Sequence, residues 1–140
     1  DRALGSVHLA LVLGSIRSQD ETLVRVHEPL SVLDLLDASS GTHSWGIGEA
    51  LNAIRAAGAG VMVLMNCSQS GETLQAQLAA QLSGQRPARQ GRSMELRAYG
   101  IGAQILRDLG VGKMRLLAAP LKMPSMAGFG LEVTGYAERD

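Results

Sequence analysis

The 140-residue sequence predicts an α/β protein built on a mixed, partly antiparallel sheet. Short apolar runs alternate with segments whose apolar residues recur at helical spacing. One run, residues 61–65, is apolar without interruption, as expected of a strand buried on both faces. It directly follows a predicted helix, and a helix-then-strand unit is typical of α/β or α+β packing. The patterns together predict about six strands and three main helices.

The first two predicted strands are residues 7–13 and residues 22–27. The first is an apolar run closed by Gly14, and the second alternates apolar and polar side chains. A short polar turn, residues 17–21, joins them. We therefore expect these two strands to pair with each other as an antiparallel hairpin.

Residues 31–36 suit a strand or a helical turn equally well, and residues 37–44 have the small, polar composition of a loop. A helix is predicted next, ended by Gly58 and Gly60. Its apolar residues at helical spacing are Ile47, Leu51 and Ile54.

The second predicted helix has Ser70 as its N-cap and Glu72 in its first turn. Its apolar positions are Leu74, Leu78 and Leu82. Residues 85–93 carry three arginines and no apolar pattern, which predicts a mobile loop. The third helix, ended by Gly110, has its apolar positions at Ile101, Ile105 and Leu109.

Two further strands are predicted at residues 113–117 and residues 131–136. Between them, residues 120–130 are rich in turn-forming residues and leave room for at most one helical turn.

The composition excludes several classes of function. Lys plus Arg equals Asp plus Glu at 13 each, so no overall field recruits nucleic acid or an anionic membrane. No apolar run approaches the roughly 18 residues of a membrane span. Cys67 is the only cysteine, which excludes an intrachain disulfide and a zinc site of several thiolates. We expect one cytoplasmic domain over residues 1–140, without nucleic-acid or membrane partners.

Three groups of residues could carry chemistry. Glu95, Arg97 and Tyr99 would place a carboxylate, a guanidinium and a phenol around one cleft, although surface charges explain them equally well. The helix start at Ser70 could meet an anion or simply be a capped helix end. The remaining metal-binding residue types show no recognised ligand spacing; they are His8, His27, His43 and Cys67.

The sequence of residues 97–111, RAYGIGAQILRDLGV, resembles the signature helix of GTP cyclohydrolase II. Residues 114–117 and 128–133 resemble the segments that follow it in that family, and residues 7–12 and 23–27 resemble the family's first strands. The resemblance covers nearly the whole chain. It implies a three-layer α/β/α fold, a homodimer, and descent from enzymes that use zinc and magnesium to convert GTP to a diaminopyrimidine ribosyl phosphate, formate and pyrophosphate.

The resemblance also locates the family's zinc ligands, which are three cysteines. An ungapped alignment places them at Leu30, Gly41 and His43. Only His43 could ligate a metal, and one imidazole does not hold catalytic zinc. We therefore expect neither zinc nor another cofactor in this domain.

The family's substrate contacts are also reduced. Its arginine-rich segment for phosphate corresponds to residues 66–71, which carry no positive charge. Its acid-x-Arg pair corresponds to Glu95 and Arg97, and its Thr-Asn-Asn-Pro-Lys-Lys run to residues 118–123, where Lys122 remains. We therefore expect neither GTP binding nor GTP hydrolysis.

These departures imply an inactive domain from a longer protein of riboflavin biosynthesis, which the sequence's start at a strand also suggests. In such proteins the N-terminal half is a 3,4-dihydroxy-2-butanone 4-phosphate synthase, and this domain would aid dimerisation, or stabilise or tune that partner. One alternative is an active cyclohydrolase whose unusual site uses Glu95, Arg97, His43 and Cys67. Another is a nucleotide or flavin sensor that binds through Ser70, Arg97 and Lys122.

Overall fold

The computed structural model describes most of the chain. The described residues are 7–28, 44–65, 71–84, 92–120 and 125–139. The ambiguous residues 31–36 and the helix cap predicted at Ser70 lie outside them.

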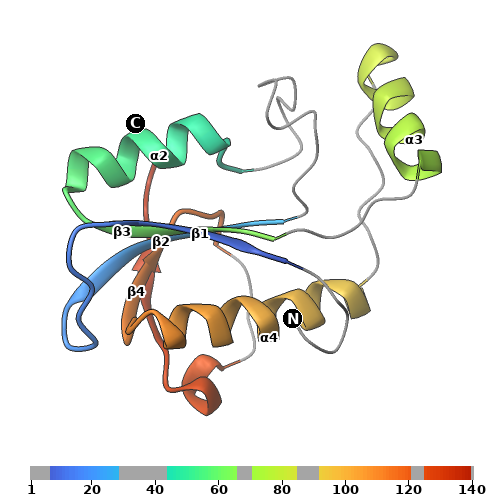
Figure 1. The fold of residues 1–140 in the computed structure, drawn as a ribbon. Helices are drawn as coiled ribbons and strands as arrows, with labels where there is room; N and C mark the ends of the chain where they lie inside the picture. Colours follow the sequence, from blue (N-terminus) through green and yellow to red (C-terminus); the bar gives the residue numbers. More distant parts are fainter. Residues whose placement is uncertain (1–6, 29–43, 66–70, 85–91, 121–124, 140) are drawn as a thin grey trace.

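The described residues form one five-stranded sheet in the order β1-β3-β2-β4-β5. Its strands are β1 (Leu9–Leu13), β2 (Glu21–His27), β3 (Gly60–Leu64), β4 (Lys113–Leu116) and β5 (Glu132–Tyr136). Strand β1 runs antiparallel to β3, whereas the pairs β3 with β2, β2 with β4, and β4 with β5 are parallel. The sheet is therefore mixed, as predicted, and seen edge-on it separates two helical layers (Figure 1).

The predicted hairpin between the first two strands is wrong. Strand β3 lies between them, with Leu11 of β1 opposite Met62 and Val24 of β2 opposite Val61. The physical reason is burial, since all five residues of β3 are buried and such a strand needs neighbours on both sides. A short connection predicts that two strands are adjacent only if no other, more apolar strand takes the place between them.

Helix α2 (Ile47–Ala57) covers one face of the sheet. Its inward residues Ala50 and Ile54 pack in a cluster with Met62 and Leu64 of β3. The helix ends where the glycine pattern predicts, since Gly58 adopts the left-handed conformation at φ 78° and its N–H meets the carbonyl groups of the last turn.

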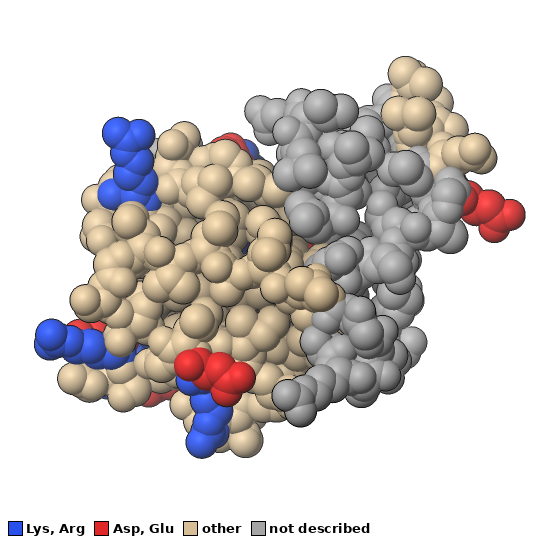
Figure 2. All heavy atoms as spheres, in the orientation of Figure 1, with Lys and Arg blue, Asp and Glu red and all other residues tan. Residues whose placement is uncertain are grey.

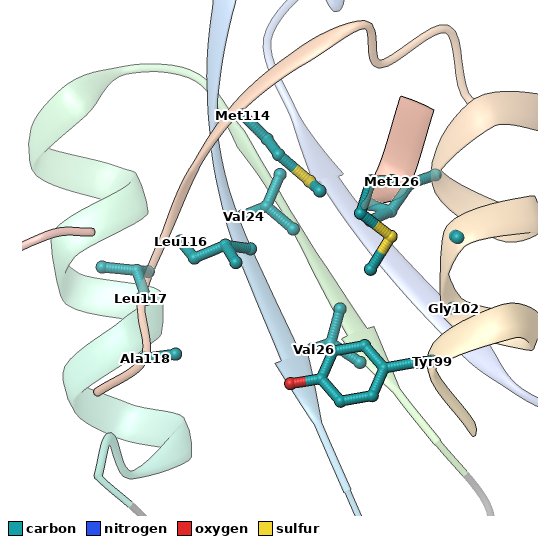
Figure 3. Close-up of a pocket in the computed structure, with 11 residues that line it drawn as sticks. Val24, Val26, Tyr99, Gly102, Met114, Leu116, Leu117, Ala118 and Met126 are labelled. Atoms are coloured by element: carbon teal, nitrogen blue, oxygen red, sulfur yellow. The ribbon is translucent and has the colours of Figure 1, made fainter. Parts of the chain in front are cut away.

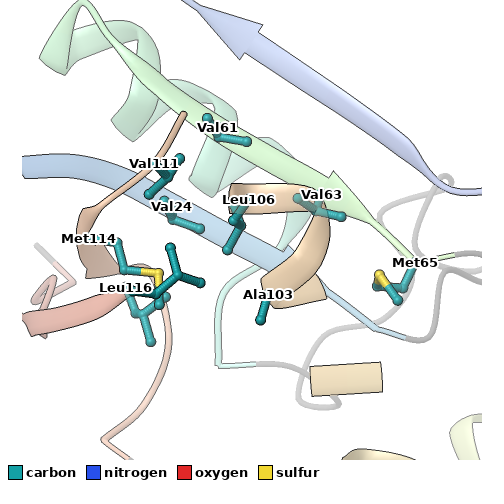
Figure 4. Packing of buried hydrophobic residues seen from close by; sticks show 10 residues of the cluster. Val24, Val61, Val63, Met65, Ala103, Leu106, Val111, Met114 and Leu116 are labelled. Carbon is teal, nitrogen blue, oxygen red and sulfur yellow. The ribbon is translucent and has the colours of Figure 1, made fainter. Parts of the chain in front are cut away.

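Helix α4 (Arg92–Asp108) covers the opposite face. Its Ala103 and Leu106 pack against Val61 and Val63, the alternate residues of β3 (Figure 4). Because successive side chains of a strand point to opposite faces, the uninterrupted apolar run of β3 supplies both cores. The three-layer α/β/α arrangement expected from the family resemblance is thereby confirmed.

Helix α3 (Gly71–Leu82) stands apart from the sheet (Figure 1). Glu72 lies in its first turn, as predicted, whereas Leu78 and Leu82 are exposed. The loop predicted for residues 85–93 is too long, because Arg92 and Ser93 already belong to α4. These two residues have no apolar pattern that would predict a helix. They extend α4 because its later turns are anchored in the core.

A single 3₁₀ turn, η1 (Met126–Phe129), precedes β5 and matches the one helical turn predicted there. Arg107 holds it against α4 by donating from Nη1 to the carbonyl oxygen of Phe129 at 2.7 Å. Within the described part of the chain, no helix combines the length and apolarity needed to cross a membrane.

Candidate functional site

The parallel strands β2, β3 and β4 end at the same edge of the sheet, which is where α/β proteins usually bind ligands. Two features of the described residues lie at this edge. A buried polar cluster occupies the α2 side of β2, and a small apolar pocket occupies the α4 side. This division follows from the alternation along β2, where Arg25 and His27 point one way and Val24 and Val26 the other.

The first feature, the Arg25 cluster, consists of Arg25, His27 and the backbone carbonyl groups of Trp45 and Leu117. Arg25 donates from Nη1 to the Leu117 oxygen at 2.8 Å and from Nη2 to the Trp45 oxygen at 2.9 Å. Its Nη2 also lies 3.3 Å from Nδ1 of His27. Arg25 is 5% exposed and His27 is fully buried, so this is an interior network.

The Arg25 cluster holds two backbone segments in place. A guanidinium stays charged even when buried, and its hydrogen bonds are correspondingly strong. Here it ties β2 to the residue after β4 and to the segment that leads into α2. His27, which ends β2, contacts the Arg25 guanidinium inside this network.

A second set of contacts holds the same segment from outside. The Ser44 hydroxyl accepts from the Ala119 N–H at 3.1 Å, and Arg139 donates from Nη1 to the Ser44 carbonyl oxygen at 3.0 Å. Arg139 also forms an ion pair with Glu49. The Gly46 N–H and Arg139 both hydrogen-bond the Glu49 carboxylate, and in that order they lower its pKa. The start of α2 is thus fixed to Arg139, which follows β5.

The second feature, the Tyr99 pocket, is a cavity of about 60 Å³ between α4, the sheet and η1 (Figure 3). Tyr99 contributes the one hydroxyl group among its lining side chains. The other lining residues are Val24, Val26, Gly102, Ala103, Leu106, Met114, Leu116, Leu117, Ala118 and Met126. Since one ordered water needs roughly 10–15 Å³ of such volume, this pocket has room for a few waters and not for a nucleotide.

The structure places the sequence-predicted residues unevenly. Tyr99 lines the pocket. Glu95 and Arg97 lie in the same helix, but their side chains are outside the described part of the structure. The cluster of these three therefore stays a prediction. His8 lies just before β1 and His27 ends β2. The remaining candidates lie outside the described residues; they are Leu30, Gly41, His43, Cys67, Ser70 and Lys122.

Arg25 is the site residue that sequence reasoning missed. The sequence nevertheless contained an indication. Arg25 alternates with Leu23 and His27 along β2, so its side chain lies on the face of the sheet that a helix covers. A charged residue on a covered face predicts a buried network, because such a charge is costly unless it is hydrogen-bonded.

The metal expected of the family does not fit the residues present. Of the three positions that the resemblance aligns with the family's zinc ligands, Leu30 and Gly41 have no donor atom in their side chains, and His43 supplies a single imidazole. Across the part of the chain that the structure describes, no group of three His, Cys, Asp or Glu residues could hold a metal ion. The absence of zinc stays a prediction, because Leu30, Gly41 and His43 lie outside the described residues.

Comparison with known proteins extends these observations. A 3,4-dihydroxy-2-butanone 4-phosphate synthase from Neisseria meningitidis (strain Z2491) is 41% identical over 140 residues, which cover 100% of this chain and 37% of that protein. A riboflavin biosynthesis protein RibBA from Cytophaga hutchinsonii is 36% identical, over 93% of this chain and 34% of that protein. The chain thus spans about a third of the length of these relatives.

A solved structure shows the same architecture. RibBX, a two-domain 3,4-dihydroxy-2-butanone 4-phosphate synthase from A. baumannii, superimposes with a TM-score of 0.58 and 36% identity. The match covers 97% of this chain and 33% of RibBX. The family model of GTP cyclohydrolase II matches residues 1–138. This chain therefore belongs to the GTP cyclohydrolase II family.

Proposed function

We propose that this chain serves riboflavin biosynthesis as a GTP cyclohydrolase II-like domain that neither binds zinc nor hydrolyses GTP. In this proposal it dimerises and supports an attached 3,4-dihydroxy-2-butanone 4-phosphate synthase. The support for the pathway and for the attached synthase is that relatives bearing these names match the chain over about a third of their length.

The observation that carries the proposal is the set of side chains at the family's zinc positions. Catalytic zinc is held by three protein ligands and lowers the pKa of its bound water so that hydroxide forms near neutral pH. With Leu30 and Gly41 at two of those positions, His43 would be a lone ligand. Without the metal, the hydrolytic steps lack their nucleophile.

The two features at the carboxyl edge of the sheet agree with a supporting role. The Arg25 cluster directs its charged donors at backbone carbonyl groups of the chain itself. The Tyr99 pocket is apolar and too small for a purine nucleotide. The Arg25 cluster therefore stabilises the fold at this edge, which supports a structural role for it.

A metal analysis tests the loss of chemistry. The purified protein at its native length is dialysed against zinc, its metal content is measured by mass spectrometry, and formate release from GTP is followed with zinc and magnesium present. A known family enzyme provides the positive control. We expect less than 0.1 zinc per chain and no formate above background.

A variant with restored ligands, Leu30→Cys, Gly41→Cys and His43→Cys, provides the matched comparison. It should gain about one zinc per chain, because three thiolates form the site that the wild type lacks. Stoichiometric zinc in the wild type, together with GTP turnover abolished by Arg97→Ala, would show that the domain is an active cyclohydrolase.

The supporting role has its own test. Deleting this domain from the full-length protein should lower the thermal stability or the oligomeric state of the synthase, or change its turnover. Unchanged stability, assembly and synthase activity would refute that role and leave the zinc result standing.

A further inference from the structure

The Tyr99 pocket joins several elements of the fold. Its lining side chains come from β2, β4, α4 and η1, and from the two residues that follow β4 (Figure 3). Apart from the Tyr99 hydroxyl, these side chains are apolar. A ligand seated in the pocket would therefore touch both parallel strands, the long helix and the 3₁₀ turn at once.

The chemistry of the lining selects against charged ligands. Among the described residues that line the pocket, none carries a charge. A carboxylate or phosphate would lose its water there without gaining a cation, and the burial of an unpaired charge is costly. On the face drawn in Figure 2, the Lys and Arg side chains stand singly at the margin of the described surface and do not form a cluster that would attract an anion. The pocket therefore favours an uncharged ligand.

Water is a poor occupant of this pocket. A well-held water makes two to four hydrogen bonds, whereas the lining side chains offer one hydroxyl group. Displacing poorly ordered water by an apolar group gains affinity. The lining therefore favours a hydrocarbon group over the solvent.

The volume of the pocket sets the size of that group. The cavity measures about 60 Å³. At roughly 10–15 Å³ for each water-sized atom, such a cavity accepts a ligand of about four to six non-hydrogen atoms. A branched alkyl group of this size is compact enough for the space, whereas a purine is too large.

Two walls of the pocket can adapt to the shape of a ligand. The thioether groups of Met114 and Met126 point toward the space between β2 and α4 in Figure 3. Methionine is unbranched and flexible, so it adjusts to irregular occupants at little cost. Met126 also lies on η1, a single turn that Arg107 holds to α4 through the Phe129 carbonyl oxygen.

We propose that the Tyr99 pocket binds small, uncharged molecules with a branched alkyl group, of about four to six non-hydrogen atoms. Binding joins β2, β4, α4 and η1 through one ligand and so stabilises the folded state in proportion to ligand concentration. This inference goes beyond the proposed function and is independent of it, because it requires neither zinc nor GTP chemistry at the family's zinc positions.

Methyl NMR tests the proposal at the level of single residues. The native-length protein is labelled with ¹³C at its methionine methyl groups and titrated with isobutanol. Met114 and Met126 line the pocket, whereas Met62 is buried on the α2 side of the sheet. We expect saturable shifts of the Met114 and Met126 signals and none at Met62. Substituting each of these methionines by leucine in turn assigns the signals.

Isobutyrate is the matched control ligand. It has the carbon skeleton of isobutanol but carries a carboxylate, so it should leave all three signals in place. Equal shifts with both compounds, or shifts at Met62 as large as those at Met114 and Met126, would show a general solvent effect and overturn the proposal. The absence of any shift below the isobutanol concentration that unfolds the protein would overturn it too.

A pair of glycine variants in the same helix provides the second measurement. Gly102 lines the pocket, whereas Gly100 does not and would accept a Cβ at 4.0 Å from the Phe129 ring. Gly102→Ala occupies part of the cavity and should weaken isobutanol binding by at least about fourfold, the value of one buried CH₂ group. Gly100→Ala should leave binding unchanged. Equal effects of the two variants would place the ligand elsewhere, while the zinc and deletion experiments judge the proposed function separately.

Discussion

Arg25 Nη2 lies 3.3 Å from Nδ1 of His27, with both side chains buried on the α2 side of the same strand. The pair is two residues apart, which is the spacing that puts both side chains on one face of β2. A charged group in this position organises the strand ends, because its donors reach the backbone after β4 and before α2. These contacts hold three segments of the chain together at the carboxyl edge of the sheet.

Replacing Arg25 should destabilise the protein. Arg25→Met removes two charge-assisted hydrogen bonds and leaves the carbonyl groups of Leu117 and Trp45 without this donor. We expect the free energy of unfolding to fall by about 2–5 kcal/mol, measured by urea denaturation. Arg17→Met, at an exposed arginine, is the control and should change it by less than about 0.5 kcal/mol. Equal effects of the two changes would contradict a structural role for the buried guanidinium.

The pKa of Glu21 depends on a threonine at the far edge of the sheet. The Thr134 hydroxyl, 2.6 Å from Oε2 of Glu21, is the main cause that lowers this pKa below 4.5, and Arg115 adds to the effect. Since the folded pKa is lowered, the stabilisation is present above the unfolded pKa and is lost as pH falls through the folded value.

Thr134→Val should raise the pKa of Glu21 and weaken this loss of stability in acid. An NMR titration of the side-chain carboxyl signals measures the shift. The pKa of Glu49, lowered by Gly46 and Arg139, serves as an internal reference and should not move. If the pKa of Glu21 did not change, the Thr134 hydroxyl would donate its proton to the Met114 carbonyl oxygen instead, which lies 3.0 Å away.

Two glycines should respond in opposite directions to alanine. A Cβ at Gly60 would lie 2.8 Å from the Leu23 carbonyl oxygen and 2.9 Å from a methyl carbon of Ile54, so Gly60→Ala should cost about 1–3 kcal/mol. A Cβ at Gly102 would meet Val26 at 3.4 Å, an ordinary contact. Because Gly102 is inside α4, Gly102→Ala should gain about 0.5–1 kcal/mol in chemical denaturation. A loss at Gly102 would show that the Tyr99 pocket cannot accept one methyl group.

The core beneath α4 should be sensitive to truncation. Leu106 is 2% exposed and lines the Tyr99 pocket, so Leu106→Ala enlarges an existing cavity. We expect a loss of about 2–5 kcal/mol in the free energy of unfolding. Leu82→Ala, at a side chain that is 83% exposed, removes the same atoms and should cost far less. Comparable losses would indicate that α3 packs on a surface in solution.

The elements themselves were predictable from local pattern. The alternation of residues 22–27, the apolar run of residues 61–65 and the glycine after α2 each indicate a structure that forms where predicted. The start of α4 was not predictable, because Arg92 and Ser93 have no apolar periodicity and join the helix through its later turns. The buried role of Arg25 followed from the same alternation once a helix was placed over that face.

The residue pattern alone predicted the fold class and most of the element positions, because hydrophobic periodicity is a local property. The lack of zinc ligands at Leu30 and Gly41 comes from the family resemblance and stays a prediction. The tertiary structure settled the strand order, which places β3 between β1 and β2. It also decided that Arg25 reaches Leu117 across 92 positions of sequence. Strand order and long-range contacts of this kind depend on which strand takes the most buried position in the sheet. Packing over the whole chain decides this.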